Sequence, residues 1–130
     1  MPLSWRQLTS LLGPPGAIPP ETIWIAAPQA NEKRIVLRAP HSLSITRVDA
    51  VLSGSGSGSP SVSFHLRHGA DTSATGAAST SSAMTVSSTS SGTAFSSFAN
   101  AIVPAEHWMW LEITAVAGSP AGLTISLLLS

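Results

Sequence analysis

The sequence lacks cysteine and is poor in charge. With no cysteine among its 130 residues, the chain forms no disulfide, no thiolate metal site and no cysteine nucleophile. Six basic residues balance six acidic ones, and charged residues make up 9% of the chain, against about 25% in an average soluble domain. This composition argues against binding to nucleic acid, which needs clustered Lys and Arg. Because charge keeps soluble monomers apart, we expect much of the surface to contact other protein.

Long apolar runs and helical spacing are also scarce. No apolar stretch approaches the ~18 residues that cross a bilayer. The N-terminus lacks the basic start, apolar region and cleavage site of a signal peptide. We therefore expect no membrane partner and no export through a signal peptide. Spacing typical of a helix is absent beyond residue 12.

Residues 1–20 have the character of an arm. In SWRQLTSLL (residues 4–12), Ser4 is a candidate N-cap for a short helix. Four apolar side chains share one face of this helix: Trp5, Leu8, Leu11 and Leu12. A helix of about two turns is marginal alone, so it docks either on its own domain or, as an anchor peptide, on another component. The proline-rich GPPGAIPP (13–20) favours an extended spacer.

From residue 21 to residue 130 the pattern is that of β-strands. The strongest candidate strands lie at residues 22–26, 33–38, 42–52, 61–68, 107–117 and 122–129. Met84 and Val86, then Phe95 and Phe98, anchor two weaker strands in a Ser/Thr-rich stretch. About eight strands separated by turn signals predict an all-β antiparallel sandwich or jelly roll. The segment GSPAG between the last two strands is typical of a hairpin loop.

Alternation assigns side chains to the two faces of each strand. In SVSFHLRH (61–68) it predicts three inward side chains: Val62, Phe64 and Leu66. In SLSITRVDAVL (42–52) the phase changes, which predicts a bulge near Arg47. The Gly/Ser segment between these strands only has to turn the chain around, since the entropy of closing a loop grows slowly with its length.

The sequence offers no catalytic arrangement. His65 and His68 are three residues apart on a strand, so they point to opposite faces and cannot chelate one metal. The glycines of GSGSG (54–58) do not match a nucleophile elbow, and no P-loop or dinucleotide motif occurs. Glu112 is a solvated or interface charge rather than a glycosidase carboxylate. We expect no enzymatic activity, no metal and no cofactor.

The tryptophans are more informative about function. In HWMWLEI, one face of the strand carries Met109, Leu111 and Ile113. Trp108 and Trp110 therefore point to the other face. Three arrangements remain open for that face: it is covered by the N-terminal segment or a loop, it is buried against a sister subunit, or it is a platform for sugar rings.

Further side chains can contribute to such a surface. Trp24 joins either the subunit interface or the platform. Arg38, Arg47 and Arg67 point outward by alternation and supply a polar rim or intersubunit ion pairs. The candidate set for a subunit interface or ligand platform is Trp24, Trp108, Trp110, Arg38, Arg67 and His65.

Three segments carry a resemblance to a known group of proteins. They are SITRVDAVLSGSGSGSPSVSFHLRHGAD, FANAIVPAEHWMWLEITAVAGSP and LTISL, between residues 44 and 127. They resemble the small β-domains of virion structural proteins of tailed bacteriophages. The resemblance rests on patterning and composition, and it leaves residues 1–20 unmatched.

The resemblance implies a non-enzymatic role in a virion. Such domains serve as capsid cement or decoration proteins, head fibres or fibre knobs, commonly as homotrimers. We therefore expect a trimeric β-domain that residues 1–20 tie to the major capsid protein or to another virion component assembled in the host cytoplasm. The alternative is a receptor- or glycan-binding tip of a tail fibre. Exposure distinguishes the two, because a sugar platform needs at least one Trp ring open to water.

Overall fold

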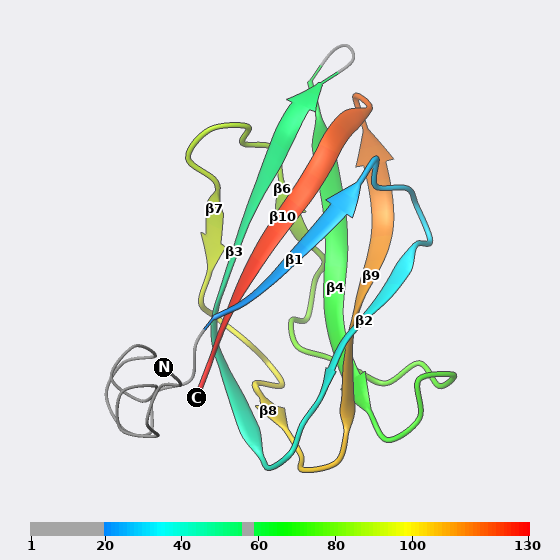
Figure 1. Cartoon of the computed structure of the whole chain (residues 1–130), viewed down its shortest axis with the longest axis vertical. Helices are drawn as coiled ribbons and strands as arrows, with labels where there is room; N and C mark the ends of the chain where they lie inside the picture. Colours follow the sequence, from blue (N-terminus) through cyan, green and yellow to red (C-terminus); the bar gives the residue numbers. More distant parts are fainter. Residues whose placement is uncertain (1–19, 56–58) are drawn as a thin grey trace, which may run out of the picture.

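The computed structural model describes residues 20–55 and 59–130, and within them the chain forms ten β-strands and no helix (Figure 1). One sheet, here sheet A, contains β1 Glu21–Ala26, β3 Leu43–Ser55, β7 Thr93–Phe95, β8 Ile102–Val103 and β10 Pro120–Leu129. The other, sheet B, contains β2 Lys33–Arg38, β4 Ser61–Gly69, β5 Ala77–Ala78, β6 Met84–Val86 and β9 Trp108–Ala117. No helix that could cross a membrane occurs in this part of the chain.

The strands are wound as a jelly roll. Sheet A has the order β1-β10-β3-β7 with β8 also paired to β3, and sheet B has the order β2-β9-β4-β5 with β6 also paired to β4. All paired strands are antiparallel. The chain alternates between the two sheets over its first four strands, from β1 in sheet A to β4 in sheet B, and it crosses again from β9 in sheet B to β10 in sheet A (Figure 1). The fold is therefore the predicted all-β antiparallel sandwich, with two-residue strands β5 and β8 beyond the eight or so expected.

Alternation explains which side chains fill the space between the sheets. Along β4, buried and half-buried residues alternate over the whole strand, and Val62, Phe64 and Leu66 are at most 1% exposed, as predicted. The ring of Phe64 meets that of Phe95 edge-on, with 6.2 Å between the centroids. The other central strands contribute Val48, Leu52, Met109, Leu111, Ile113, Leu123, Ile125 and Leu127, all at most 1% exposed. One apolar core thus joins both sheets.

The predicted bulge near Arg47 is present in β3. Leu128 lies opposite Arg47 while the next residue of β10 lies opposite Ile45, so Thr46 is the extra residue. The Thr46 hydroxyl donates a hydrogen bond of 2.6 Å to the Leu128 carbonyl. Because the bulge shifts the alternation by one residue, Ile45 and Val48 both point into the core.

The segment GSPAG is not the hairpin loop that its position predicts. β9 belongs to sheet B and β10 to sheet A, so residues 118–119 carry the chain from one sheet to the other. Gly118 and Ser119 both have positive φ, at 71° and 47°. A Cβ on Gly118 would lie 2.6 Å from the Ser59 carbonyl oxygen. The sequence pattern correctly indicates a tight connection between two strands. It does not show which strands β9 and β10 pair with, because their partners lie far away in the chain.

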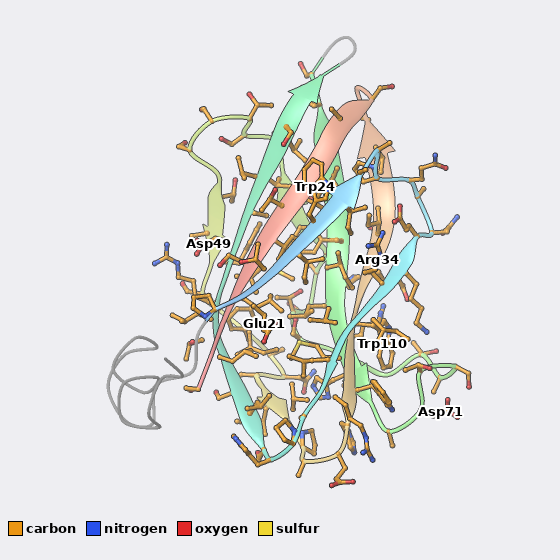
Figure 2. The ribbon with its side chains drawn as sticks, viewed as in Figure 1. Glu21, Trp24, Arg34, Asp49, Asp71 and Trp110 are labelled. Atoms are coloured by element: carbon orange, nitrogen blue, oxygen red, sulfur yellow. The ribbon has the colours of Figure 1, made fainter. Side chains whose placement is uncertain are left out.

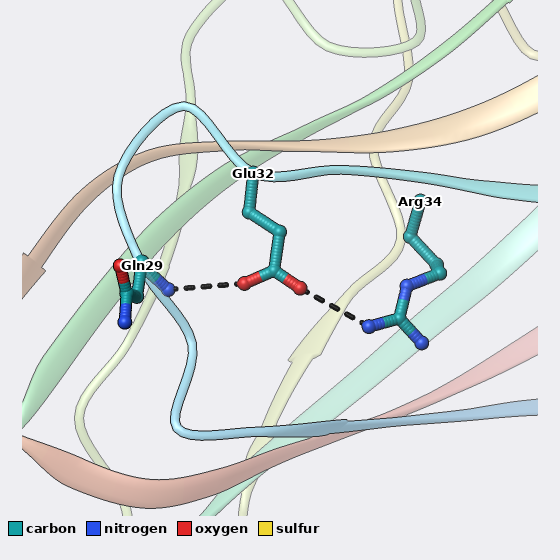
Figure 3. Close-up of polar contacts among 3 residues, drawn as sticks. All are labelled: Gln29, Glu32 and Arg34. Carbon is teal, nitrogen blue, oxygen red and sulfur yellow. Dashed lines mark hydrogen bonds and ion pairs between the residues drawn. The ribbon is translucent and has the colours of Figure 1, made fainter.

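The connection between β1 and β2 also crosses from one sheet to the other, and Glu32 holds it. One carboxylate oxygen of Glu32 accepts the backbone N–H of Gln29 at 3.2 Å, and the other pairs with Arg34 at 3.1 Å (Figure 3). β2 forms an edge of sheet B. Its Lys33, Arg34 and Arg38 oppose pairing with a strand of another chain, since charged side chains protect an edge.

Candidate functional site

Trp108 and Trp110 lie on the outer face of sheet B. Met109, between them, is fully buried in the core, as alternation predicted. Trp110 is nevertheless 0% exposed, because the backbone of Gly76, in the loop of residues 70–76, lies against its ring. Figure 2 shows this loop, with Asp71, beside Trp110. Gly76 in this loop has φ +70°, and a Cβ there would lie 2.6 Å from the ring. Only glycine allows the loop to approach so closely.

Lys33 holds this loop in place. Its Nζ lies 4.7 Å from the centroid of the Trp110 ring, a cation–π contact, and donates a hydrogen bond to the Thr72 carbonyl. Asp71 accepts hydrogen bonds from the backbone N–H and the hydroxyl of Ser73 at 2.9 and 2.7 Å. These bonds, and secondarily Lys33, lower the pKa of Asp71. Trp110 has no exposed surface, which corrects its assignment to an interface or ligand platform: a loop of its own chain covers it.

Arg67 and His65 lie beside Trp110 on the same face. Arg67 pairs in register with Trp110, and His65 with Glu112. Arg67 Nε is 3.5 Å from a carboxylate oxygen of Glu112, so its charge is balanced within the chain. Burial, and secondarily Arg67, lower the pKa of His65 against the opposing effect of Glu112. These side chains therefore present polar groups without an unpaired charge.

Arg38 and Trp108 form the rim of this face at the end of β2. The guanidinium carbon of Arg38 lies 5.8 Å from the centroid of the half-buried Trp108 ring. Arg38 also pairs with the Glu106 carboxylate at 2.9 Å, and both side chains are more than half exposed. Such an exposed pair contributes less than about 1 kcal/mol. The Arg38 charge is thus met within the chain rather than left free for a neighbouring subunit.

Trp24 lies on the opposite side of the molecule, on the outer face of sheet A (Figure 2). Its side chain is 52% exposed. The six-membered ring lies over Gly122 of β10, where a Cβ would be only 1.8 Å from ring carbon Cη2. Trp24 therefore cannot act together with Trp108 and Trp110. Of the residues predicted to form one interface or platform, Trp24 lies on the outer face of sheet A, and the others lie on sheet B.

A shallow hollow of about 130 Å³ lies next to Trp24 on the outer face of sheet A. Its lining includes Asp49, Val51, Ser91, Thr124 and Ser126. Thr124 is the register partner of both Trp24 and Val51, so the backbone of Trp24 shares one row of the sheet with the hollow, while its ring extends over Gly122. Sequence reasoning missed Thr124 and Ser126. Alternation along the last strand places them opposite the leucines, but their position beside Trp24 depends on β10 lying between β1 and β3.

His68 and Ser79 are buried polar residues. His68 is 7% exposed and faces the core while His65 faces outward, as their spacing predicted. The Ser79 hydroxyl has no hydrogen-bond partner among the described residues, so it does not form a nucleophile–base pair with a histidine. Burial lowers the pKa of His68; a hydrogen bond to the Asn100 backbone opposes this, and His107 adds to it. Within residues 20–55 and 59–130, no three His, Asp or Glu side chains are grouped to hold a metal ion.

The side chains predicted to attach the chain to a particle are Trp5, Leu8, Leu11 and Leu12. They lie outside the described residues, as do the whole predicted helix and the spacer as far as residue 19. Their role stays a prediction.

No family model, no curated protein and no solved structure matches this chain. The function is therefore inferred from the fold, from the two outer faces and from the sequence resemblance.

Proposed function

We propose that this chain is a non-enzymatic structural protein of a tailed-bacteriophage particle, in which the sandwich is a trimeric knob and residues 1–20 attach it to the capsid or tail. The segments that resemble virion proteins include β3, β4, β9 and β10. These are the inner strands of the two sheets. The jelly-roll winding recurs in viral capsid domains and in lectins, which supports the proposal as an analogy of fold.

The observation that carries the proposal is the charge-poor outer face of sheet A. Two of the four exposed large hydrophobic side chains in the described part of the chain, Ile102 and Leu128, lie at one end of it, and a third, Trp24, lies farther along the same face. Apart from Glu21 at the start of β1, the strands of sheet A carry two charged residues, Arg47 and Asp49. These two pair with each other at 2.9 Å. A neutral face with exposed apolar side chains is typical of a surface that binds another protein.

Contact between sister chains is assigned to the part of this face around Ile102 and Leu128. Leu128 lies on β10, and Ile102 pairs with Ser44 across the neighbouring β3. Two strand spacings of ~4.8 Å therefore separate the two apolar strand positions across the sheet. Thr46 lies on β3 between them and donates its hydroxyl to the Leu128 carbonyl. Arg47, the register partner of Leu128, pairs with Asp49 at 2.9 Å. Burial of this apolar patch between sister chains stabilises the proposed assembly. The number of three subunits comes from the sequence resemblance to virion proteins.

Light scattering on the purified full-length chain tests the proposal. We expect three times the chain mass, with a fall to the single-chain mass for Leu128→Lys and Ile102→Lys, because each variant buries an unpaired charge in the contact. Gln29→Lys places the same charge on an exposed loop and is the matched control. A single-chain mass for the unaltered protein at high concentration overturns the proposal, as does equal dissociation of the control.

A further inference from the structure

We propose that Trp24 and the adjoining hollow form a binding site for a neutral glycan, with a sugar ring against the indole and a second part of the glycan at the hollow. This inference shares with the proposed function only the outer face of sheet A, to which it adds a ligand. The glycan site does not depend on trimer formation or on attachment to a particle. Trp24 lies four residues along β10 from the Leu128 position, counted from its partner Thr124, or about 13 Å. Subunit contact and glycan binding therefore use different parts of the face.

The position of Trp24 leaves one side of an aromatic ring open. Gly122 has no side chain to push the indole away from the sheet, and the ring covers it. About half of the side chain nevertheless remains in contact with solvent, at 52% exposure. The face of an aromatic ring is electron-rich and attracts the weakly positive C–H groups of an apolar surface. One side of a sugar ring with equatorial hydroxyls is such a surface.

Polar groups of the right kind surround the ring. The outward neighbours of Trp24 on β1 and β10 include Thr22, Thr124 and Ser126. A hydroxyl donates one hydrogen bond and accepts two, so it matches sugar hydroxyls, which need both. A partner protein that buries Trp24 in an apolar contact would instead leave these hydroxyls unpaired, at a cost to its affinity.

The hollow supplies a second contact. Its lining is mainly apolar with a few polar groups, among them Asp49 and Ser126, the usual character of a small-molecule site. At about 130 Å³ it is smaller than the roughly 300 Å³ of the smallest drug-sized pockets, so it accepts only a small part of a ligand. The charge of Asp49 is balanced by Arg47 at 2.9 Å, which favours an uncharged ligand over an ionic one.

The wall of the hollow is fixed before a ligand binds. The Ser88 hydroxyl accepts hydrogen bonds from the backbone N–H groups of Ser90, Ser91 and Gly92, at 3.3, 3.2 and 2.9 Å. Gly92, with φ +79°, lies so close to β3 that a Cβ would be 2.9 Å from the Ala50 carbonyl oxygen. A wall held in this way loses little conformational entropy on binding. The ring lies over Gly122, two to four residues along β10 from Thr124 and Ser126 of the hollow. This is about 7–13 Å, so an oligosaccharide reaches both.

Titration of the full-length protein with three neutral hexasaccharides tests the site. Cellohexaose and maltohexaose differ in linkage, β-1,4 against α-1,4, and hexa-N-acetylchitohexaose adds acetamido groups to the β-1,4 chain. Calorimetry together with tryptophan emission reports binding. We expect at least one of them to bind and to shift the emission of Trp24 to shorter wavelength. Trp24→Ala should weaken binding at least about tenfold, because it removes the aromatic face against which the sugar ring packs.

Further variants separate the site from the fold. Thr124→Val keeps the shape of the side chain, removes the hydroxyl and should weaken binding several-fold without altering thermal stability. Ile35→Ala removes an equally exposed apolar side chain, 51% exposed, from the opposite sheet and should leave binding unchanged. Full affinity in Trp24→Ala, or no binding of any hexasaccharide up to about 10 mM, overturns the inference. Light scattering on the same samples reports subunit association independently, so failure of the glycan site and failure of the proposed function are distinguishable.

Discussion

Replacing Gly76 by alanine tests whether the loop of residues 70–76 is packed on Trp110. Gly76 has φ +70°, a region in which an L side chain is strained. The added Cβ would lie 2.6 Å from two carbons of the Trp110 ring and 2.8 Å from the His68 carbonyl oxygen. The ring is fully buried and the other contact is backbone. Neither neighbour can give way, so the loop must lift from the ring.

A control separates backbone strain from steric overlap. Gly54 also has positive φ, at +46°, but the nearest atom to an added Cβ is 3.7 Å away, which is ordinary contact. Left-handed strain costs about 1–2 kcal/mol, and overpacking a filled site costs about 1–3 kcal/mol more. We expect Gly54→Ala to lower the free energy of unfolding by about 1–2 kcal/mol, and Gly76→Ala by about 2–5 kcal/mol.

Urea unfolding followed by circular dichroism measures both free energies, with equal dependence on urea concentration expected for the two variants. Native Gly76→Ala should also emit at longer wavelength than Gly54→Ala, because water gains access to Trp110. If the two variants lose the same stability and share the emission of the unaltered protein, the loop does not cover Trp110 and the reasoning is refuted.

Two further predictions concern the histidines of β4 and the core residue Phe64. Burial keeps the pKa of His68 below its ordinary value, and His65 is shifted in the same direction. Below about pH 6.5 the unfolded chain therefore binds more protons than the folded one. The free energy of unfolding is therefore highest above that pH and falls as the pH drops toward the folded-state pKa values. Urea unfolding at about pH 7.5 and about pH 5 should show this fall, and His68→Gln should make the fall smaller. A free energy of unfolding that does not change with pH contradicts the argument. Phe64→Ala empties a fully buried site between the sheets and should cost about 3–5 kcal/mol in the same assay; a loss below about 1 kcal/mol would place Phe64 outside the core.

Local patterning was sufficient to predict the longer strands. The segment KRIVLR forms β2 within its predicted bounds, and the bulge near Arg47 followed from one change of phase. A strand with one face on the core must alternate, so its pattern is visible without knowledge of its neighbours. β5 and β8 have two residues each, too few to show alternation. They form because β4 and β3 offer them backbone partners.

The candidate surfaces were predicted less well, and the tryptophans show why. Alternation correctly placed Trp108 and Trp110 outward on β9, but it carries no information about what lies over an outward side chain. Trp110 is covered because Gly76 lets the loop of residues 70–76 approach its ring and Lys33 donates a hydrogen bond to that loop. The Trp24 ring lies flat on the sheet because the residue beneath it is Gly122, and Trp24 remains about half exposed, at 52%. Both outcomes depend on residues brought together from distant parts of the chain.

Composition and a period of two residues are enough to establish the scarcity of charge, the β character of the chain and the side of each long strand that faces the core. The placement of β9 and β10 in different sheets, the burial of Trp110, the exposure of Trp24 and the row that Trp24 shares with Thr124 and Val51 emerge only in the folded chain. Backbone hydrogen bonds between strands are nearly the same for every sequence, so they do not select the partner strand. The choice of partner strand is therefore made by how all the apolar faces are buried together.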